Sequence, residues 1–559
     1  MIRMATRRAS TSVLAVLVLA IASPPVHAQE ARAFTHADTL RGSNGPARAW
    51  WDVLFYDLRV AISVQDSSIS GQNSITYRVL QPGSEMQIDL QVPLVVDSMV
   101  FAGQRLSDRR DGNAFFARLP VAQRPGETPT VTVHYHGRPH VAVNPPWDGG
   151  FIWQEDSLGN PWIATANQGL GASVWWPSKD YLGDEPDSQR VAIRIPTQMT
   201  DVSNGRLRST TLNEDGTTTY EWFVASPINN YSVTVNAGRY AHWQETYPGA
   251  SGPLTLDFWP LAVNEAVARR QWTQVRPMLR CFEDWFGPFP WYEDGYKLVE
   301  TPHLGMEHQT AIAYGNGYEN GYRGRDLSGT GRGLEWDFII IHESAHEWWG
   351  NHVTAKDNAD LWIHESFANY AESLYTECQL GSREAGADYV IGTRALVEND
   401  RPIVGAYGVN DEGSGDMYYK GGNMLHTIRQ LVGDDAEWRE ILRGLQRDFA
   451  RQTVTNVQIE EYIARASGLA LDEVFDQYLR TTRIPVLEVA LEGRTLWYRW
   501  ADVVPGFDMP VEVTLGPGAA SRIRPTEAWQ SVPTSLGNAA DLGVDRDYYV
   551  LTRAVRRIP

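Results

Sequence analysis

Two histidines and a glutamate at fixed spacing constrain the fold of this chain more than any other feature. His342 and His346 are four residues apart, and Glu365 follows His346 after eighteen intervening residues. On a helix, side chains four residues apart lie on one face, so both imidazoles can reach the same ion. Two histidines and one glutamate form a catalytic zinc set, because they leave a fourth position open for water. The spacing therefore predicts a metal site, with Glu343 placed to accept the proton of that water.

Residues 1–28 are typical of a secretory signal peptide. Arg3, Arg7 and Arg8 form a basic start, and the apolar run at 13–22 is too short to span a membrane. A small-x-small sequence at 26–28 offers a cleavage site, with no cysteine there for a lipid anchor. The alternative is a buried N-terminal helix, which the flanking charges disfavour. We therefore expect a periplasmic or secreted protein of a bacterium-like cell.

The net charge of −19 narrows the range of partners. Nucleic acid and anionic lipid both attract proteins through clustered Lys and Arg, so we expect no nucleic acid partner. No segment after residue 28 is apolar enough for a membrane-spanning helix, so we expect no stable membrane insertion. The sequence does not indicate an oligomeric state.

Hydrophobic patterning predicts an α+β fold with three domains after the signal peptide. Residues 29–237 predict an antiparallel β-domain, because apolar residues alternate at 58–64, 131–135 and 231–235. Residues 238–483 predict a mostly helical domain, and residues 484–559 a small β-sandwich. The predicted helices span 263–286, 335–349, 360–380, 384–398, 417–432, 434–450 and 456–480.

The residues around the metal motif resemble the aminopeptidase N family of gluzincins, which also contains leukotriene hydrolase. Residues 342–351 read H-E-S-A-H-E-W-W-G-N, and residues 361–368 read L-W-I-H-E-S-F-A. The family phrase N-E-G-F-A is therefore altered, with His364 in place of Asn and Ser366 in place of Gly. The resemblance implies a thermolysin-like catalytic domain that holds one zinc ion per chain through His342, His346 and Glu365.

A second family signature, G-x-M-E-N, lies upstream as Gly305-Met306-Glu307-His308 after Leu304. The resemblance implies that Glu307 binds the free α-amino group of a substrate, with Gly305 and Met306 beside it. A buried carboxylate suits this task, because charge-assisted hydrogen bonds to a cation are strong. His308 replaces the family Asn, and we interpret it as a support rather than a substrate contact.

Two further segments carry the resemblance. Residues 418–421 read Y-Y-K-G and match the family's Y-x-K-G, which implies that Tyr418 donates a hydrogen bond to the oxyanion of the reaction. Tyr419 is the competing tyrosine, and its place in the motif favours packing. Asn167-Gln168-Gly169-Leu170 resembles a weaker signature in which Gln168 helps to bind the substrate amine. The alternative for Gln168 is an ordinary loop amide.

Together these residues predict a zinc aminopeptidase that acts on peptides with a free N-terminus. One alternative is a zinc endopeptidase of thermolysin type, and another is a non-catalytic peptide-binding scaffold. Larger family members continue into a long helical C-terminal domain, so we expect an open cleft that admits longer peptides. Cys281 and Cys378 could form a disulfide, which the sequence leaves open.

Overall fold

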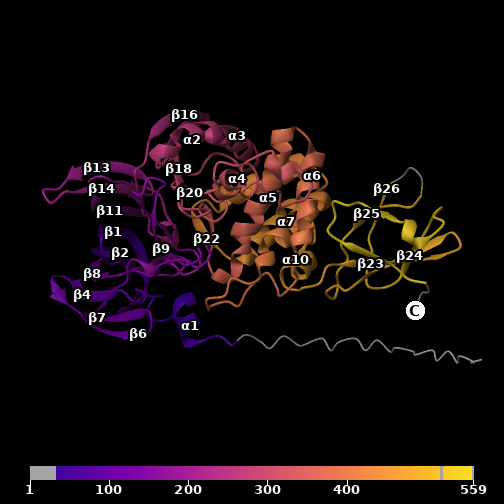
Figure 1. The fold of residues 1–559 in the computed structure, drawn as a ribbon. Helices are drawn as coiled ribbons and strands as arrows, with labels where there is room; N and C mark the ends of the chain where they lie inside the picture. The colour runs from indigo at the N-terminus through magenta and orange to yellow at the C-terminus, as the bar shows by residue number, and fades with distance from the viewer. Residues whose placement is uncertain (1–32, 517–519, 557–559) are drawn as a thin grey trace, which may run out of the picture. The chain divides into compact units, whose positions relative to one another are not determined.

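The computed structural model describes residues 33–516 and 520–556, and the chain from His36 onward forms one compact unit. A β-rich N-terminal region is followed by a helical middle region and a C-terminal β region (Figure 1). This arrangement confirms the predicted α+β class. The predicted signal peptide at 1–28 lies outside the described residues. Within the described ranges, no helix is both long and apolar enough to cross a membrane.

An eight-stranded sheet forms the centre of the N-terminal region. Its neighbouring strands are antiparallel except β1 and β11, which run parallel. Leu58, Val60 and Ile62 on β1 are all buried, as the alternation of the sequence predicts. In sheet order, the strands are β13 (Arg206–Leu212), β14 (Thr217–Val224), β11 (Ser188–Pro196), β1 (Trp51–Ser63), β2 (Ser68–Val79), β8 (Thr130–Gly137), β4 (Val95–Phe101) and β5 (Gln104–Arg105).

A smaller, four-stranded sheet belongs to the same N-terminal region. Its strands are β12 (Thr200–Val202), β15 (Asn236–Gly238), β10 (Pro161–Ala166) and β9 (Gly150–Glu155). A three-stranded sheet lies elsewhere in the same region and contains β3 (Gly83–Asp89), β7 (Ala114–Gln123) and β6 (Ser107–Asp111). Strand β10 ends two residues before Gln168, so it carries that side chain to the edge of the β-rich region.

The strand predicted at 231–235 is wrong. A 3-10 turn covers residues 230–232, and β15 begins only at Asn236. The side-chain oxygens of Asn204 and Thr165 accept hydrogen bonds from the backbone N–H groups of residues 234 and 235. The alternating apolar residues are buried, so the pattern indicated burial while polar side chains replaced part of the strand pairing.

A mixed five-stranded sheet begins the middle region. In sheet order, its strands are β16 (Trp243–Gly249), β17 (Gly252–Trp259), β18 (Tyr296–Glu300), β20 (Ile312–Tyr314) and β19 (Gly305–Met306). Strand β19 therefore lies at an edge, with one side of its backbone unpaired within the described chain. An edge strand is a template for binding an extended peptide.

Helices dominate the rest of the middle region (Figure 1). They are α2 (Glu265–Gln271), α3 (Val275–Phe286), α4 (Phe338–Ala345), α5 (Trp362–Leu380), α6 (Arg383–Gly392), α7 (Tyr419–Val432), α8 (Asp435–Asp448), α9 (Asn456–Ser467) and α10 (Asp472–Leu479). The single helix predicted at 456–480 is wrong, since the structure has two helices there, α9 and α10. Gly468 ends α9 in the left-handed conformation at φ 66°. A 3-10 turn at Trp272–Gln274 likewise divides the helix predicted at 263–286.

Cys281 on α3 and Cys378 on α5 form a disulfide with their Cα atoms 6.0 Å apart. The structure therefore shows that the two cysteines pair, which the sequence left open. A cross-link over 97 residues of chain stabilises a fold by about 4–5 kcal/mol in the chain-entropy model. The bond ties α3 to the helix that carries Glu365.

The C-terminal region consists of two small sheets whose buried side chains continue the core of the helical region. The strands are β23 (Val486–Glu492), β24 (Thr495–Ala501), β27 (Gln530–Pro533) and β29 (Leu551–Ala554) in one sheet, and β25 (Val511–Thr514), β26 (Ala520–Ile523) and β28 (Gly543–Val544) in the other. The N-terminal sheets form a separate core around Trp51 and Trp176. The domain boundaries at 237/238 and 483/484 remain predictions.

Candidate active site

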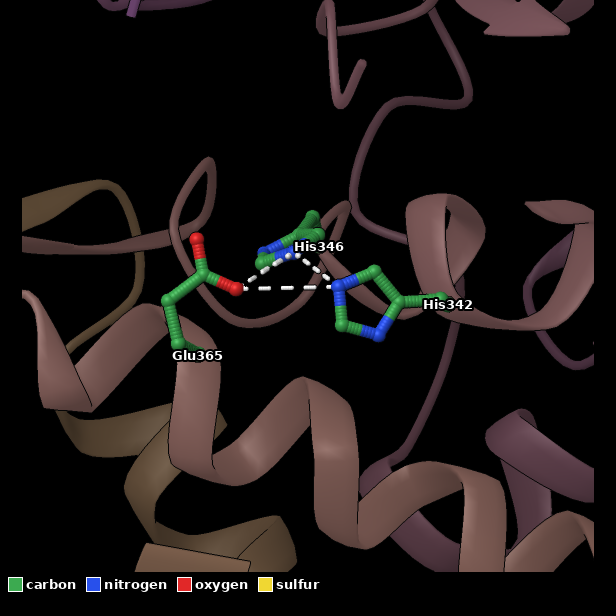
Figure 2. Close-up of side chains that lie close together, drawn as sticks. All are labelled: His342, His346 and Glu365. Atoms are coloured by element: carbon green, nitrogen blue, oxygen red, sulfur yellow. Dashed lines mark hydrogen bonds and ion pairs between the residues drawn. The ribbon is translucent and has the colours of Figure 1, made fainter. Parts of the chain in front are cut away.

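The structure brings His342, His346 and Glu365 to one point, where α4 meets α5 (Figure 2). The two Nε2 atoms are 3.3 Å apart, and Glu365 Oε2 lies 3.6 Å and 3.4 Å from those of His342 and His346. Ligand atoms about 2.0–2.1 Å from zinc in a tetrahedral site lie about 3.3–3.4 Å from one another. Glu365 Oε2 is buried and has no hydrogen-bond donor in the described chain. An ion would satisfy it, so the donor set fits zinc.

Each imidazole is oriented through its second nitrogen. His342 Nδ1 lies 2.7 Å from a carboxylate oxygen of Glu372, and His346 Nδ1 lies 2.9 Å from the carbonyl oxygen of Trp349. Both Nε2 atoms are therefore left for a metal, since such partners fix the ring orientation of metal-binding histidines. The Tyr389 hydroxyl donates to the other oxygen of Glu372 at 2.6 Å.

Sequence reasoning missed Glu372. It follows Glu365 by seven residues on α5, which is two helical turns along the same face. That spacing was the available signal, because a carboxylate on the metal-facing side of the helix can support a ligand. Its side chain is fully buried.

We expect Glu372→Gln to lower zinc affinity by about 10- to 100-fold, because the amide supports the His342 ring less strongly than a carboxylate does. Competition with a metal chelator measures this change. Glu384→Gln is the control, since the Glu384 side chain is 81% exposed at the start of α6. Equal zinc affinity in the Glu372 variant and the control would contradict the supporting role.

Asp337 fixes the start of α4, because its carboxylate accepts hydrogen bonds from the N–H groups of Ile339 and Ile340. Glu343 on this helix lines the same cavity as the metal set. Burial raises the pKa of Glu343 to about 7, against the opposing charge of His342. Gly305 explains how closely strand β19 approaches, since a Cβ there would lie 2.6 Å from Glu343 Oε1. The carboxylate therefore lies between the metal set and the edge strand.

Glu307 directly follows strand β19, and its carboxylate lies close to that of Glu343 and to the His346 ring. Its Oε1 accepts hydrogen bonds from Gln168 Nε2 at 2.7 Å and from the Tyr231 hydroxyl at 3.1 Å. Gln168 Nε2 is also 3.3 Å from Glu365 Oε1, so the amide joins the two carboxylates. Asn351 Nδ2 donates to the Glu307 carbonyl oxygen at 2.9 Å. Sequence reasoning missed Tyr231, whose apolar neighbours had indicated a strand.

Tyr418 precedes α7, and its ring centroid is 6.0 Å from that of His342. Burial raises the pKa of Tyr418 well above its usual value, so the phenol keeps its proton at neutral pH. The Ser366 hydroxyl donates to the Met417 carbonyl oxygen at 2.6 Å and fixes the approach to Tyr418. A Cβ on Gly421 would lie 1.9 Å from Ser366 Oγ, which explains that glycine in the Y-x-K-G segment.

Two of the three departures from the family phrases, His308 and His364, do not line the cavity. His364 Nε2 accepts a hydrogen bond from the Ala355 N–H at 2.8 Å, and burial lowers its pKa to about 3. His308 is fully buried, and burial lowers its pKa well below the usual value. Both are therefore neutral residues of the interior rather than cavity-lining ones. Tyr419, by contrast, lines the cavity beside Tyr418 instead of only packing.

All of the predicted site residues line one cavity of about 430 Å³. They are Gln168, Gly305, Met306, Glu307, His342, Glu343, His346, Glu365 and Tyr418. Met306 also packs against Ala164 and Ala166 of β10, so the β-rich region forms part of the wall. The arrangement places a metal set, a buried carboxylate, a protonated phenol and an acidic pocket for a cation in one space.

Comparison with known proteins identifies the same region. Residues 278–478 match the model of the Peptidase family M1 domain. "Probable aminopeptidase 1" of Sulfurisphaera tokodaii is 26% identical over 330 residues, which cover 56% of this chain and 40% of that protein. "Aminopeptidase N" of Lactococcus lactis subsp. lactis is 28% identical over 174 residues, which cover 28% of this chain and 20% of that protein. The matches thus span less than half the length of these relatives.

Solved structures share the fold. The M1 zinc metallopeptidase from Deinococcus radiodurans has a TM-score of 0.65 and 22% identity, covering 78% of this chain and 95% of that one. A mutant of that metallopeptidase bound to a Tyr-Ser-Ala substrate has a TM-score of 0.65 and 23% identity, covering 80% and 98%. The family match over the metal-bearing region and the aminopeptidase relatives therefore support an aminopeptidase N-like M1 peptidase domain at residues 278–478.

Proposed function

We propose that the protein is a zinc-dependent aminopeptidase that removes N-terminal residues from peptides with a free amino end. The cluster of Glu307, Glu343 and His346 carries this proposal, because one ligand atom from each lies within 4.8 Å of the others. An α-ammonium held by Glu307, with Gln168 beside it, places the first peptide bond next to the metal set, since one extended residue spans about 3.4 Å. A peptide bond further along the chain would lie beyond it.

His342, His346 and Glu365 would hold a zinc ion, which would supply a Lewis acid and make water a stronger nucleophile at neutral pH. Glu343 accepts the proton of the attacking water and returns it to the leaving amine. Tyr418 donates a hydrogen bond to the carbonyl oxygen as negative charge develops on it. Glu307 and Gln168 hold the amino terminus throughout, which supports cleavage after the first residue.

We expect Tyr418→Phe to lower kcat by about 10²- to 10³-fold with little change in KM, because the lost hydrogen bond forms fully only in the transition state. Steady-state kinetics on an aminoacyl-p-nitroanilide measures both constants. Tyr419→Phe is the matched control, because it removes a neighbouring hydroxyl from the same cavity wall. Equal losses in the two variants would remove Tyr418 from the mechanism.

The order in which products appear tests the proposed function. Mass spectrometry of an unmodified decapeptide should show successive loss of residues from the amino end, as one-residue steps. A thermolysin-type endopeptidase would release internal fragments first, and a peptide-binding scaffold would leave the decapeptide intact. Either of those outcomes would refute the aminopeptidase.

We further propose that the protein acts in the periplasm or outside the cell. The basic and apolar pattern of residues 1–28 supports this, as does the Cys281–Cys378 disulfide, since such bonds persist in oxidising compartments. Cell fractionation followed by N-terminal sequencing tests it. Mature protein starting near Gln29 in the exported fraction is expected, and an intact Met1 in the cytoplasm would contradict it.

A further inference from the structure

A tight turn beside the cavity carries two arginines. Tyr322 and Arg325 exchange both backbone hydrogen bonds, so Arg323 and Gly324 are the central residues of the turn. Both central residues have positive φ, 48° for Arg323 and 74° for Gly324, as in a type I′ turn. Asn or Gly is the preferred residue at such a position, because Gly lacks the Cβ that strains the backbone at positive φ and Asn offsets that strain with local hydrogen bonds. Folding alone therefore does not explain an arginine at 323.

The turn is held rigidly against the metal helix. Asn316 accepts a hydrogen bond from the Arg323 N–H at 2.8 Å, and its Nδ2 donates to Asp337 at 2.8 Å. Asp337 is the residue that caps α4. The Gly321 N–H also donates to the Trp336 carbonyl oxygen. The position of both arginines is thus coupled to the helix that carries His342 and His346.

A path of ring contacts leads from the metal set to this turn. The ring centroid of Phe338 is 5.1 Å from that of His342 and 5.2 Å from that of Tyr322. The Arg325 guanidinium lies 5.5 Å from the centre of the Tyr322 ring. Phe338 and Tyr322 both line the cavity. The two arginines are exposed and do not line the cavity themselves, so they lie just outside it, next to Tyr322.

This turn lies at the end of the cavity opposite the amine pocket. Helix α4 begins at Phe338, whereas Glu307 lies beside Glu343 and His346, about 8 to 12 Å further along the helix axis. A peptide held by its amino end at Glu307 runs past the metal set toward Phe338. Each extended residue adds about 3.4 Å, so the second to fourth residues reach the turn.

The cavity between Glu307 and the turn is acidic, whereas the turn itself is basic. Five glutamates line the cavity, namely Glu307, Glu343, Glu365, Glu372 and Glu412. The one arginine of the lining, Arg401, pairs with Asp411 at 2.9 Å. Glu319 lies beside Gly324, and the Asp326 carboxylate accepts hydrogen bonds from Ser328 and Gly331 of its own loop. Within the described chain, neither Arg323 nor Arg325 forms an ion pair with Glu319 or Asp326, so both guanidinium groups remain able to bind an anion.

We propose that Arg323 and Arg325 bind a carboxylate of the substrate downstream of the cleaved bond, which rests on the proposed aminopeptidase function. Two sources offer this group: the free C-terminus of a short peptide and an acidic side chain near the amino end. Guanidinium groups suit either, because they pair with carboxylates in a fork geometry. The acidic cavity selects the amine, and the basic turn selects the opposite charge at the far end.

Paired peptides test this inference. We expect Ala-Ala-Ala-Ala with a free C-terminus to be cleaved about three- to tenfold faster, by kcat/KM, than its C-terminal amide. Ala-Ala-Asp-Ala-amide tests the side-chain source against Ala-Ala-Asn-Ala-amide. In the double variant Arg323→Gln, Arg325→Gln, both ratios should fall to about one, while the rate on an aminoacyl-p-nitroanilide stays unchanged. Salt should weaken the wild-type preference, because the arginines are exposed.

The control is Arg208→Gln, because Arg208 is also exposed and lies 5.4 Å over the Phe223 ring, on β13 and outside the cavity.

The variant Arg323→Asn gives a second readout. Its melting temperature should be no lower than that of the wild type, since Asn tolerates positive φ. Wild-type ratios of one, or ratios that the double variant leaves intact, would overturn the inference. Binding of both tetrapeptides to Glu343→Gln protein measures the same preference without turnover. If the wild-type protein prefers the free carboxylate in binding but cleaves no peptide, the aminopeptidase function is refuted and the carboxylate site is retained.

Discussion

Glu343→Gln should retain its zinc and lose at least about 10³-fold in kcat, which follows from the loss of a general base beside an activated water. The amide has nearly the shape of the carboxylate and cannot accept a proton. Glu343 contributes no atom to the His342, His346 and Glu365 set, so metal content should not change. Steady-state kinetics and elemental analysis of the same preparation measure the two quantities.

Glu335→Gln is the control for that variant, because Glu335 is exposed and lies just before α4. A Glu343 variant that retains more than about a tenth of wild-type kcat would exclude the proposed base, since general base catalysis contributes about 10²- to 10⁴-fold. Loss of zinc together with activity would instead indicate that Glu343 supports the metal site.

Removal of the metal should abolish activity, and one equivalent of zinc per chain should restore it. Burial opposes the charge on His346, but Glu365 raises its pKa to about 9, so the metal-free site holds a proton there that zinc must displace. Zinc affinity should therefore fall by about tenfold per pH unit for each proton displaced as the pH decreases. Titration calorimetry at several pH values, combined with activity after dialysis against a chelator, tests both statements.

Glu365→Gln should lose more zinc affinity than the about 10- to 100-fold expected when a supporting residue is replaced. The zinc-dependent rise in melting temperature should shrink in parallel, because a ligand that binds only the folded state stabilises it. Full activity in metal-free protein, or restoration at two zinc ions per chain only, would contradict the proposed site.

Local motifs predicted the site better than the course of the chain around it. The spacing of His342, His346 and Glu365 follows from helix geometry, so the sequence alone places these ligands on two helices. Glu307 and Tyr418 were found through resemblance, and the structure brings them to the same cavity. Glu372 is different: its role depends on the ring orientation of His342, which only tertiary contacts define.

Element boundaries were the least predictable part of the fold. The alternating apolar residues at 231–235 predicted a strand, but the alternation reflects burial alone. The side chains of Asn204 and Thr165 accept the backbone hydrogen bonds that a neighbouring strand would otherwise accept. The break between α9 and α10 depends on Gly468 adopting positive φ, which a glycine permits but does not require. Tyr231 reaches Glu307 from the β-rich region across 76 residues of sequence, and no local pattern reports such a contact.

The cavity should require a free amino end on the peptide, and comparing two peptides measures this requirement. A peptide and its N-acetylated twin differ only in the cation that Glu307 and Gln168 would bind. We expect kcat/KM for the free peptide to exceed that for the acetylated twin by at least about 10²-fold, because a buried carboxylate left without its cation is costly. Glu307→Gln should remove most of this difference. Equal cleavage of the two peptides by the wild-type protein would contradict the aminopeptidase account.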